Sequence, residues 1–253
     1  MLSGPTALAP IDERRIPGPP LRADIRDDEE FAENEPHQPS PLRQRLRANT
    51  YTVAGIVALA DPEPLIEGWM TAGSLNVLYA APKSGKSLLA LDWSAHVVLG
   101  RPWCGHPVTA GPVVYIAAEG RSGLSQRVRA WCTFNGREPD DLNDLRFVTM
   151  PVALLGTATA IETADHIKAI CEPSAATLIV VDTLARCFGG GDENATKDMT
   201  EFVASLDRIR LDTGAAVLVI HHAGKDETRG PAGPSRCSAQ SIASSGCRAR
   251  NAR

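Results

Sequence analysis

Aromatic residues are scarce in this sequence: they make up 5% of the 253 residues, while all hydrophobic types together make up 43%. A core must therefore consist mostly of Ala, Val, Leu and Ile, a composition typical of a parallel sheet covered by helices. The sequence also lacks an apolar run long enough to span a membrane, and its first residues form no apolar signal segment. We therefore expect a cytoplasmic protein without a membrane partner.

Paired cysteines and a basic excess are missing as well. The six cysteines form no C-x-x-C pair and no cluster with the spacing of zinc ligands. This predicts reduced thiols. The net charge of −4 excludes a uniformly basic nucleic-acid binder. It leaves open a local basic stripe, or a ring whose DNA contacts lie on loops.

The two ends of the chain lack a periodic apolar pattern. Residues 1–45 hold eight of the nineteen prolines and an acidic run. Such a segment buries too little apolar surface to offset its ordering entropy, which predicts a disordered leader. Residues 229–253 contain five arginines and no acidic residue, and we expect a second disordered tail there. The folded domain then covers residues 46–228.

Between these ends, apolar runs alternate with amphipathic stretches. The pattern predicts strands at 75–80, 113–118, 145–150, 178–181 and 215–220, and helices at 86–99, 124–134, 161–171 and 199–211. Alternation of this kind means βαβ crossovers, hence an α/β fold with a mostly parallel sheet flanked by helices.

A phosphate-binding loop follows the first of these strands. With alanine at the first glycine position, the P-loop spacing is matched by Ala80, Ala81, Pro82, Lys83, Ser84, Gly85, Lys86 and Ser87. Gly85 lets backbone N–H groups turn toward phosphate oxygens at a helix N-terminus. Lys86 would contact the β- and γ-phosphates of ATP, and the Ser87 hydroxyl would bind Mg²⁺.

Two further strands end in a carboxylate. Asp182 follows the apolar run 178–181, where it would hold Mg²⁺ through water, the Walker B role. Its alternative is a helix N-cap. Glu119 follows the strand at 113–118 and would polarise the attacking water, unless it is a surface residue at a turn. Because Thr183 and not glutamate follows Asp182, Glu119 is the better candidate for the catalytic base.

His221 and His222 end the last apolar strand. A polar side chain there can contact the γ-phosphate and report hydrolysis to neighbouring loops. A shared metal is disfavoured, because adjacent residues of a strand point to opposite faces. A hydrogen-bonded buried histidine is the alternative.

These motifs occur in a specific order: the P-loop, then Tyr-Ile-Ala-Ala-Glu-Gly at 115–120, Val-Asp-Thr-Leu-Ala-Arg at 181–186 and His-His-Ala-Gly-Lys at 221–225. The set resembles the RepA-like branch of RecA-type P-loop ATPases, the hexameric replication helicases of plasmids and similar phage proteins. The resemblance runs from about residue 66 to 226. It implies a RecA-like fold and Mg²⁺-dependent ATP hydrolysis at the subunit interfaces of a homo-hexamer, coupled to movement on single-stranded DNA.

The same resemblance implies that His221 is the γ-phosphate sensor and that residues 187–197 form a mobile loop, although a plain surface loop fits this segment equally well. A recombination or regulatory ATPase, and a nucleotide-binding protein with little hydrolysis, remain alternatives. Family members continue past the Arg-Gly pair into further strands and an arginine finger. Here Arg229-Gly230 is followed by the patternless tail. A lost reading frame would explain this switch, and so would a natural truncation. We therefore expect strand 215–220 to have an uncovered edge, and little ring formation.

Overall fold

The computed structural model describes residues 40–118, 123–222 and 237–238. The chain divides into two units, Met1–Leu59 and Ala60–Arg253. The described part of the first unit contains helices α1 (Pro41–Ala48) and α2 (Val53–Val57), neither of which has a buried residue. Helix α1 overlaps the end of the leader predicted at 1–45. The reason is a local start signal: Ser40 accepts a hydrogen bond from the Arg43 N–H at 3.3 Å, and proline occupies the first turn. Residues 1–39 lie outside the described residues.

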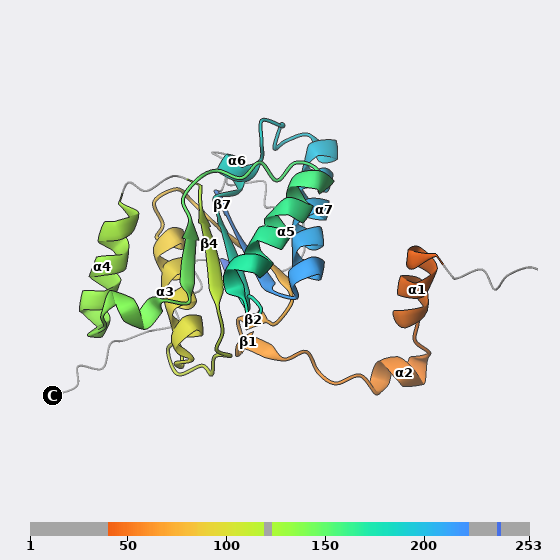
Figure 1. Ribbon diagram of the computed structural model, residues 1–253, viewed down its shortest axis with the longest axis horizontal. Coiled ribbons are helices and arrows are strands. Elements are labelled where there is room, and N and C mark those ends of the chain that lie inside the picture. Colours follow the sequence, from red (N-terminus) through yellow and green to blue (C-terminus); the bar gives the residue numbers. More distant parts are fainter. Residues whose placement is uncertain (1–39, 119–122, 223–236, 239–253) are drawn as a thin grey trace, which may run out of the picture. The chain divides into compact units, whose positions relative to one another are not determined.

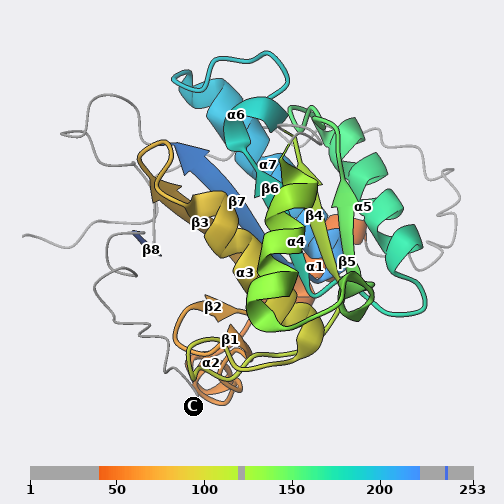
Figure 2. The ribbon, with the colours of Figure 1, turned by 90° about the vertical axis from the view of Figure 1, so that its left-hand side faces the viewer.

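The second unit is built on a parallel sheet. Its five long strands are β3 (Leu75–Ala80), β4 (Val113–Ala117), β5 (Leu145–Val148), β6 (Leu178–Asp182) and β7 (Ala216–His222). Their order across the sheet is β5-β4-β6-β7-β3, followed by the two-residue strand β8 (Cys237–Ser238) at the β3 edge (Figure 2). A separate antiparallel pair consists of β1 (Pro64–Ile66) and β2 (Met70–Thr71). The predicted α/β fold with a mostly parallel sheet is confirmed.

Helices cover both faces of this sheet. Helices α3 (Lys86–Leu99) and α4 (Leu124–Asn135) lie on one side, and α5 (Thr157–Cys171) and α7 (Thr196–Thr213) lie on the other (Figure 1). The short helices η1 (Pro139–Leu142) and α6 (Leu184–Cys187) complete the described elements of this unit. None of the described helices is long and apolar enough to cross a membrane.

Side-chain alternation along the strands produces two hydrophobic cores. In β4, Val113 and Tyr115 belong to the cluster under α3 and α4, while Val114 and Ile116 belong to the cluster under α5 and α7. All five residues of β4 and of β6 are buried. Burying one large aliphatic side chain contributes about 1.5–3 kcal/mol, so these two strands anchor both cores. They also fix the positions of whatever follows their carboxyl ends.

The strand predicted at 215–220 does not have the uncovered edge expected from the sequence. As β7, it lies between β6 and β3 and is paired along both sides. The prediction was wrong because strand order in a sheet need not follow strand order in the chain. The outer strand of this side is β3, which β8 contacts only at Leu78 and Tyr79. Strand β8 lies in the segment 229–253, for which no packed structure was expected. The expectation of little ring formation stays a prediction.

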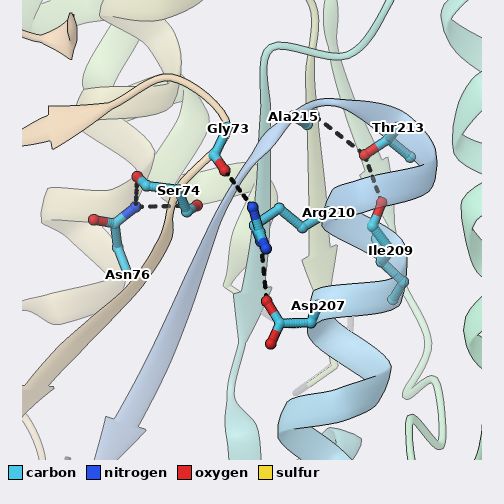
Figure 3. A network of polar contacts seen from close by, with 8 residues as sticks. All are labelled: Gly73, Ser74, Asn76, Asp207, Ile209, Arg210, Thr213 and Ala215. Atoms are coloured by element: carbon cyan, nitrogen blue, oxygen red, sulfur yellow. Dashed lines mark hydrogen bonds and ion pairs between the residues drawn. The ribbon is translucent and has the colours of Figure 1, made fainter. Parts of the chain in front are cut away.

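A polar network holds the amino end of β3 against the last turn of α7 (Figure 3). Arg210 donates to the Gly73 carbonyl at 2.9 Å and to Asp207 Oδ1 at 3.0 Å. Beside it, the Asn76 side chain donates to Ser74 Oγ at 2.8 Å, and the Ser74 carbonyl accepts from the Val217 N–H. The network therefore fixes the register of β3 against β7, and with it the position along the sheet at which the loop after β3 begins.

Among the residues that the structure describes, the thiols of Cys132, Cys171 and Cys187 are free and buried. Burial raises the pKa of each thiol, to about 11 for Cys187. Cys104 is disulfide-bonded, so the expectation that all thiols are reduced was wrong for this residue. Disulfide connectivity cannot be deduced from the spacing of cysteines in the sequence alone.

Candidate active site

The loop between β3 and α3 has the backbone shape that an anion site requires. Lys83 and Gly85 both have left-handed backbone conformations, with φ of 63° and 89°. Gly85 is the N-cap of α3, and no side chain caps the first turn of that helix. Uncapped N–H groups at a helix N-terminus, together with the helix dipole, form a site for negatively charged oxygen. A Cβ at Gly85 would have no atom within 4 Å, so the glycine is needed there for its φ and not for space.

Lys86 turns back over this loop. Its side chain is 3% exposed, and Nζ donates to the carbonyls of Ala80 at 2.7 Å and Ala81 at 2.8 Å. Burial lowers the pKa of Lys86, and the negative charge of Asp182 partly opposes that effect. An ammonium group has three donors, so these two carbonyls leave one for a ligand oxygen. The buried cation therefore lies where the phosphate loop would place a triphosphate.

Asp182, the last residue of β6, is 5% exposed. Its Oδ2 accepts a hydrogen bond of 2.6 Å from the Tyr115 hydroxyl, which also lies 3.5 Å from the carbonyl oxygen of Ser87. Burial first, and the charge of Asp182 second, raise the pKa of Tyr115 well above its usual value. The tyrosine is therefore protonated and acts as the donor. It connects Asp182 on β6 with Ser87 on α3, the two residues predicted to bind Mg²⁺.

The unpaired atoms around Asp182 fit a hydrated magnesium ion. Asp182 Oδ1 and Thr183 Oγ1 are buried and have no hydrogen-bond partner among the described residues. Buried polar atoms usually have a partner, which can be water or a ligand. No group of three or more His, Cys, Asp or Glu side chains placed for a metal occurs in the described part of the chain. Mg²⁺ needs no such group, because it binds through one or two protein oxygens plus phosphate and water.

Glu119, the predicted catalytic base, lies outside the described residues. The chain leading to it is placed: Ala117 is in register with Asp182, and the Ala118 N–H donates to the Asp182 carbonyl at 2.8 Å. The neighbouring strands β4 and β6 form a topological switch point: after β4 the chain continues to β5 at one edge of the sheet, and after β6 it continues to β7 in the opposite direction. Ligands bind at such a switch point, beyond the carboxyl ends of the strands. The role of Glu119 remains a prediction.

His221 and His222 end β7, between the strand that carries Asp182 and the strand that leads into the phosphate loop. The His221 ring lies 5.4 Å from the ring of Tyr79, its register partner on β3. Burial lowers the pKa of His221; the charge of Glu193 raises it, and His222 and Lys86 lower it. His221 is therefore neutral near pH 7 and electrostatically coupled to Lys86, and its sensor role stays a prediction.

No role for Tyr115 was predicted from the sequence, although it lies inside one of the four motifs. The sequence does contain a signal that its hydroxyl has a partner. Tyr115 is the only residue of β4 with a polar group at its tip, and a buried tyrosine hydroxyl usually finds a partner. The segment 187–197 is hydrogen-bonded to the first turn of α7 and within itself: the Asp192 N–H donates to Asp198 Oδ2 at 3.0 Å, and the Asn194 N–H donates to Asp192 Oδ1 at 2.9 Å.

A parallel α/β sheet, a glycine-containing loop at a helix N-terminus and a buried lysine facing a strand-end aspartate together define a RecA-like P-loop nucleotide-binding fold. A family model described as an AAA domain matches residues 40–228, and the chain belongs to this family. The match includes residues 40–45, which the sequence analysis had assigned to the leader. Membership points to binding of a nucleotide, with Mg²⁺, and to its hydrolysis.

Proposed function

We propose that this chain is an ATPase of the replicative DNA helicase type, which couples ATP hydrolysis to movement on single-stranded DNA. One observation carries the enzymatic part of the proposal. Lys86 and Ser87 at the start of α3 lie close to Asp182 at the end of β6, 95 residues or more further along the chain. The charge of Asp182 acts on Lys86, and the Tyr115 hydroxyl donates to Asp182 Oδ2 while lying 3.5 Å from the Ser87 carbonyl oxygen.

Each of these residues has a physical task in the proposed reaction. The N–H groups of the loop 80–87 and the start of α3 bind the phosphates of ATP, and Lys86 neutralises charge that builds up on them. Ser87 and Asp182 would hold Mg²⁺, which when bound neutralises phosphate charge and orients the phosphate groups. Glu119 is proposed to accept a hydrogen bond from the attacking water, which increases the nucleophilicity of the water oxygen.

The coupling part rests on His221 and on the resemblance of the ordered motifs to replication helicases. His221 interacts electrostatically with Lys86 on one side and with Glu193, in the segment after Asp182, on the other. Loss of the γ-phosphate would change the charge near this histidine. The changed interaction between His221 and Glu193 would then pass this signal to the segment 187–197. The proposal assigns single-stranded DNA as the partner. A homo-hexamer is the assembly that the resemblance implies for the family, whereas little ring formation is expected of this chain.

The test is ATP turnover by the purified chain with and without single-stranded DNA, followed by strand displacement on a forked duplex. Lys86→Ala is the inactive control. The proposal expects DNA to stimulate turnover and the fork to be unwound. DNA-stimulated turnover without unwinding would identify a recombination or regulatory ATPase. Tight ATP binding with negligible turnover would identify a nucleotide-binding protein, and the helicase proposal would be rejected in both cases.

A further inference from the structure

The hydroxyl of Tyr115 makes the two oxygens of Asp182 unequal. A tyrosine hydroxyl has one hydrogen to donate, and the 2.6 Å contact with Asp182 Oδ2 is much shorter than the 3.5 Å contact with the Ser87 carbonyl. The proton therefore points to Oδ2. Asp182 Oδ1 is buried and has no partner among the described residues. One carboxylate oxygen is held by the protein, and the other is left for a ligand.

We propose that Tyr115 is a positioning residue for magnesium: its hydroxyl fixes the carboxylate of Asp182 so that Oδ1 faces the ion and its water. The inference rests on the proposed function, since it assumes that this site binds a magnesium nucleotide. The terminal torsion of an aspartate is broad, so a carboxylate needs an outside contact to fix its plane. A hydrogen bond from a hydroxyl to an ionised carboxylate is short and about twice as strong as one between neutral groups.

The surroundings of Tyr115 keep this contact in place. The ring is 2% exposed and packs against Phe147 of β5, with ring centroids 5.5 Å apart. Its strand is paired on both sides, with β5 and with β6. Residue 115 is in register with Val180, two residues before Asp182, so the side chain must lean along the strands to reach the carboxylate. The hydroxyl has little freedom to move away.

The experiment compares Tyr115→Phe with the wild type, using binding of a fluorescent ATP analogue over a series of Mg²⁺ concentrations. Outer contacts of metal ligands typically affect metal affinity by about 10–100-fold. The Mg²⁺ concentration that gives half-maximal binding should therefore rise about tenfold or more in Tyr115→Phe, and excess Mg²⁺ should restore binding. Phe147→Leu is the matched control: it disturbs the packing of the same ring and keeps the hydroxyl, so its midpoint should shift much less than that of Tyr115→Phe.

A double-mutant cycle separates action through Asp182 from any other effect. In an Asp182→Asn background, adding Tyr115→Phe should cause no further shift of the Mg²⁺ midpoint. An unshifted midpoint in Tyr115→Phe alone, an equal shift in Phe147→Leu, or loss of the folded state of Tyr115→Phe in a circular-dichroism melt would each overturn the positioning role. If the wild type shows no Mg²⁺-dependent nucleotide binding, the proposed function itself fails, and this inference fails with it.

Discussion

Replacing Lys86 by alanine tests the central assignment. The ammonium is 3% exposed and donates to two loop carbonyls. With ATP bound, we expect its remaining donor to reach the β- and γ-phosphates. A hydrogen bond to a charged group contributes about 1.5–3 kcal/mol. The Kd for ATP should then rise by on the order of 10–10² in Lys86→Ala, because about 1.4 kcal/mol corresponds to a factor of ten.

The fold itself should tolerate this change. Burial disfavours the charged form of Lys86 and lowers its pKa. Its removal relieves that cost and loses two hydrogen bonds to loop carbonyls, so the two effects oppose each other and the net change in stability without nucleotide should be small. Wild-type protein should be stabilised by ATP, by about 2.7 kcal/mol at a concentration one hundred times the Kd. Lys86→Ala should keep the melting temperature of the free wild type and lose the increase that ATP causes.

Calorimetric titration with MgATP, together with thermal melts, provides the measurement. Lys168→Ala is the control, because Lys168 is a half-exposed residue of α5 that pairs with Asp165 at the surface. Such pairs contribute about 0–1 kcal/mol, and this variant should bind ATP normally. An ATP affinity of Lys86→Ala equal to that of Lys168→Ala would refute the phosphate-loop assignment.

Three further predictions follow from individual residues. Glu119→Gln should bind ATP normally and lose hydrolysis by about a hundredfold or more in a steady-state phosphate-release assay, because it keeps the shape and removes the base; normal turnover would place the base elsewhere. Because burial lowers the pKa of His221 in the folded state, the unfolded chain binds a proton at this histidine at higher pH than the folded chain does. The free energy of unfolding should therefore decrease as the pH falls below about 6.5. His221→Asn should lose less stability than the wild type between pH 7 and pH 5 in urea titrations, and an equal loss in both proteins would contradict the argument. Gly111→Ala would place a Cβ 1.8 Å from Thr177 Oγ1, and overpacking of this kind lowers the free energy of unfolding by about 1–3 kcal/mol. Adding Thr177→Ala should restore part of this loss in the same urea titration. A Gly111→Ala variant as stable as the wild type would show that the contact relaxes freely.

The five long strands and the four long helices of the second unit could be predicted from the sequence because their signals are local. The five apolar runs became strands with ends shifted by two residues at most, and helix α3 covers the predicted range 86–99. The helix end is set by Gly100, which has a φ of 60° and follows the last amphipathic turn. The phosphate loop was equally accessible, since its function depends on consecutive residues.

Features that depend on distant residues could not be read in this way. The position of β7 between β6 and β3 follows from how the crossovers pack, and no local pattern encodes it. The pairing of β8 with Leu78 and Tyr79 is of the same kind, because a two-residue strand has no periodicity. The helix α1 was missed for a different reason: its capping signal at Ser40 lies in a proline-rich region whose composition favours disorder.

Tyr115 shows why the proposed magnesium site could be predicted only in part from the sequence. In a strand with one exposed face, alternation reveals which side chains share a face. Every residue of β4 is buried, so alternation does not show which face Tyr115 joins. Its partner Asp182 is 67 residues away along the chain, and the two meet only because β4 and β6 are neighbours. The proposed Mg²⁺ ligand Asp182 is predictable as a strand-end carboxylate. The tyrosine that donates to this carboxylate depends on strand order, which the sequence pattern does not determine.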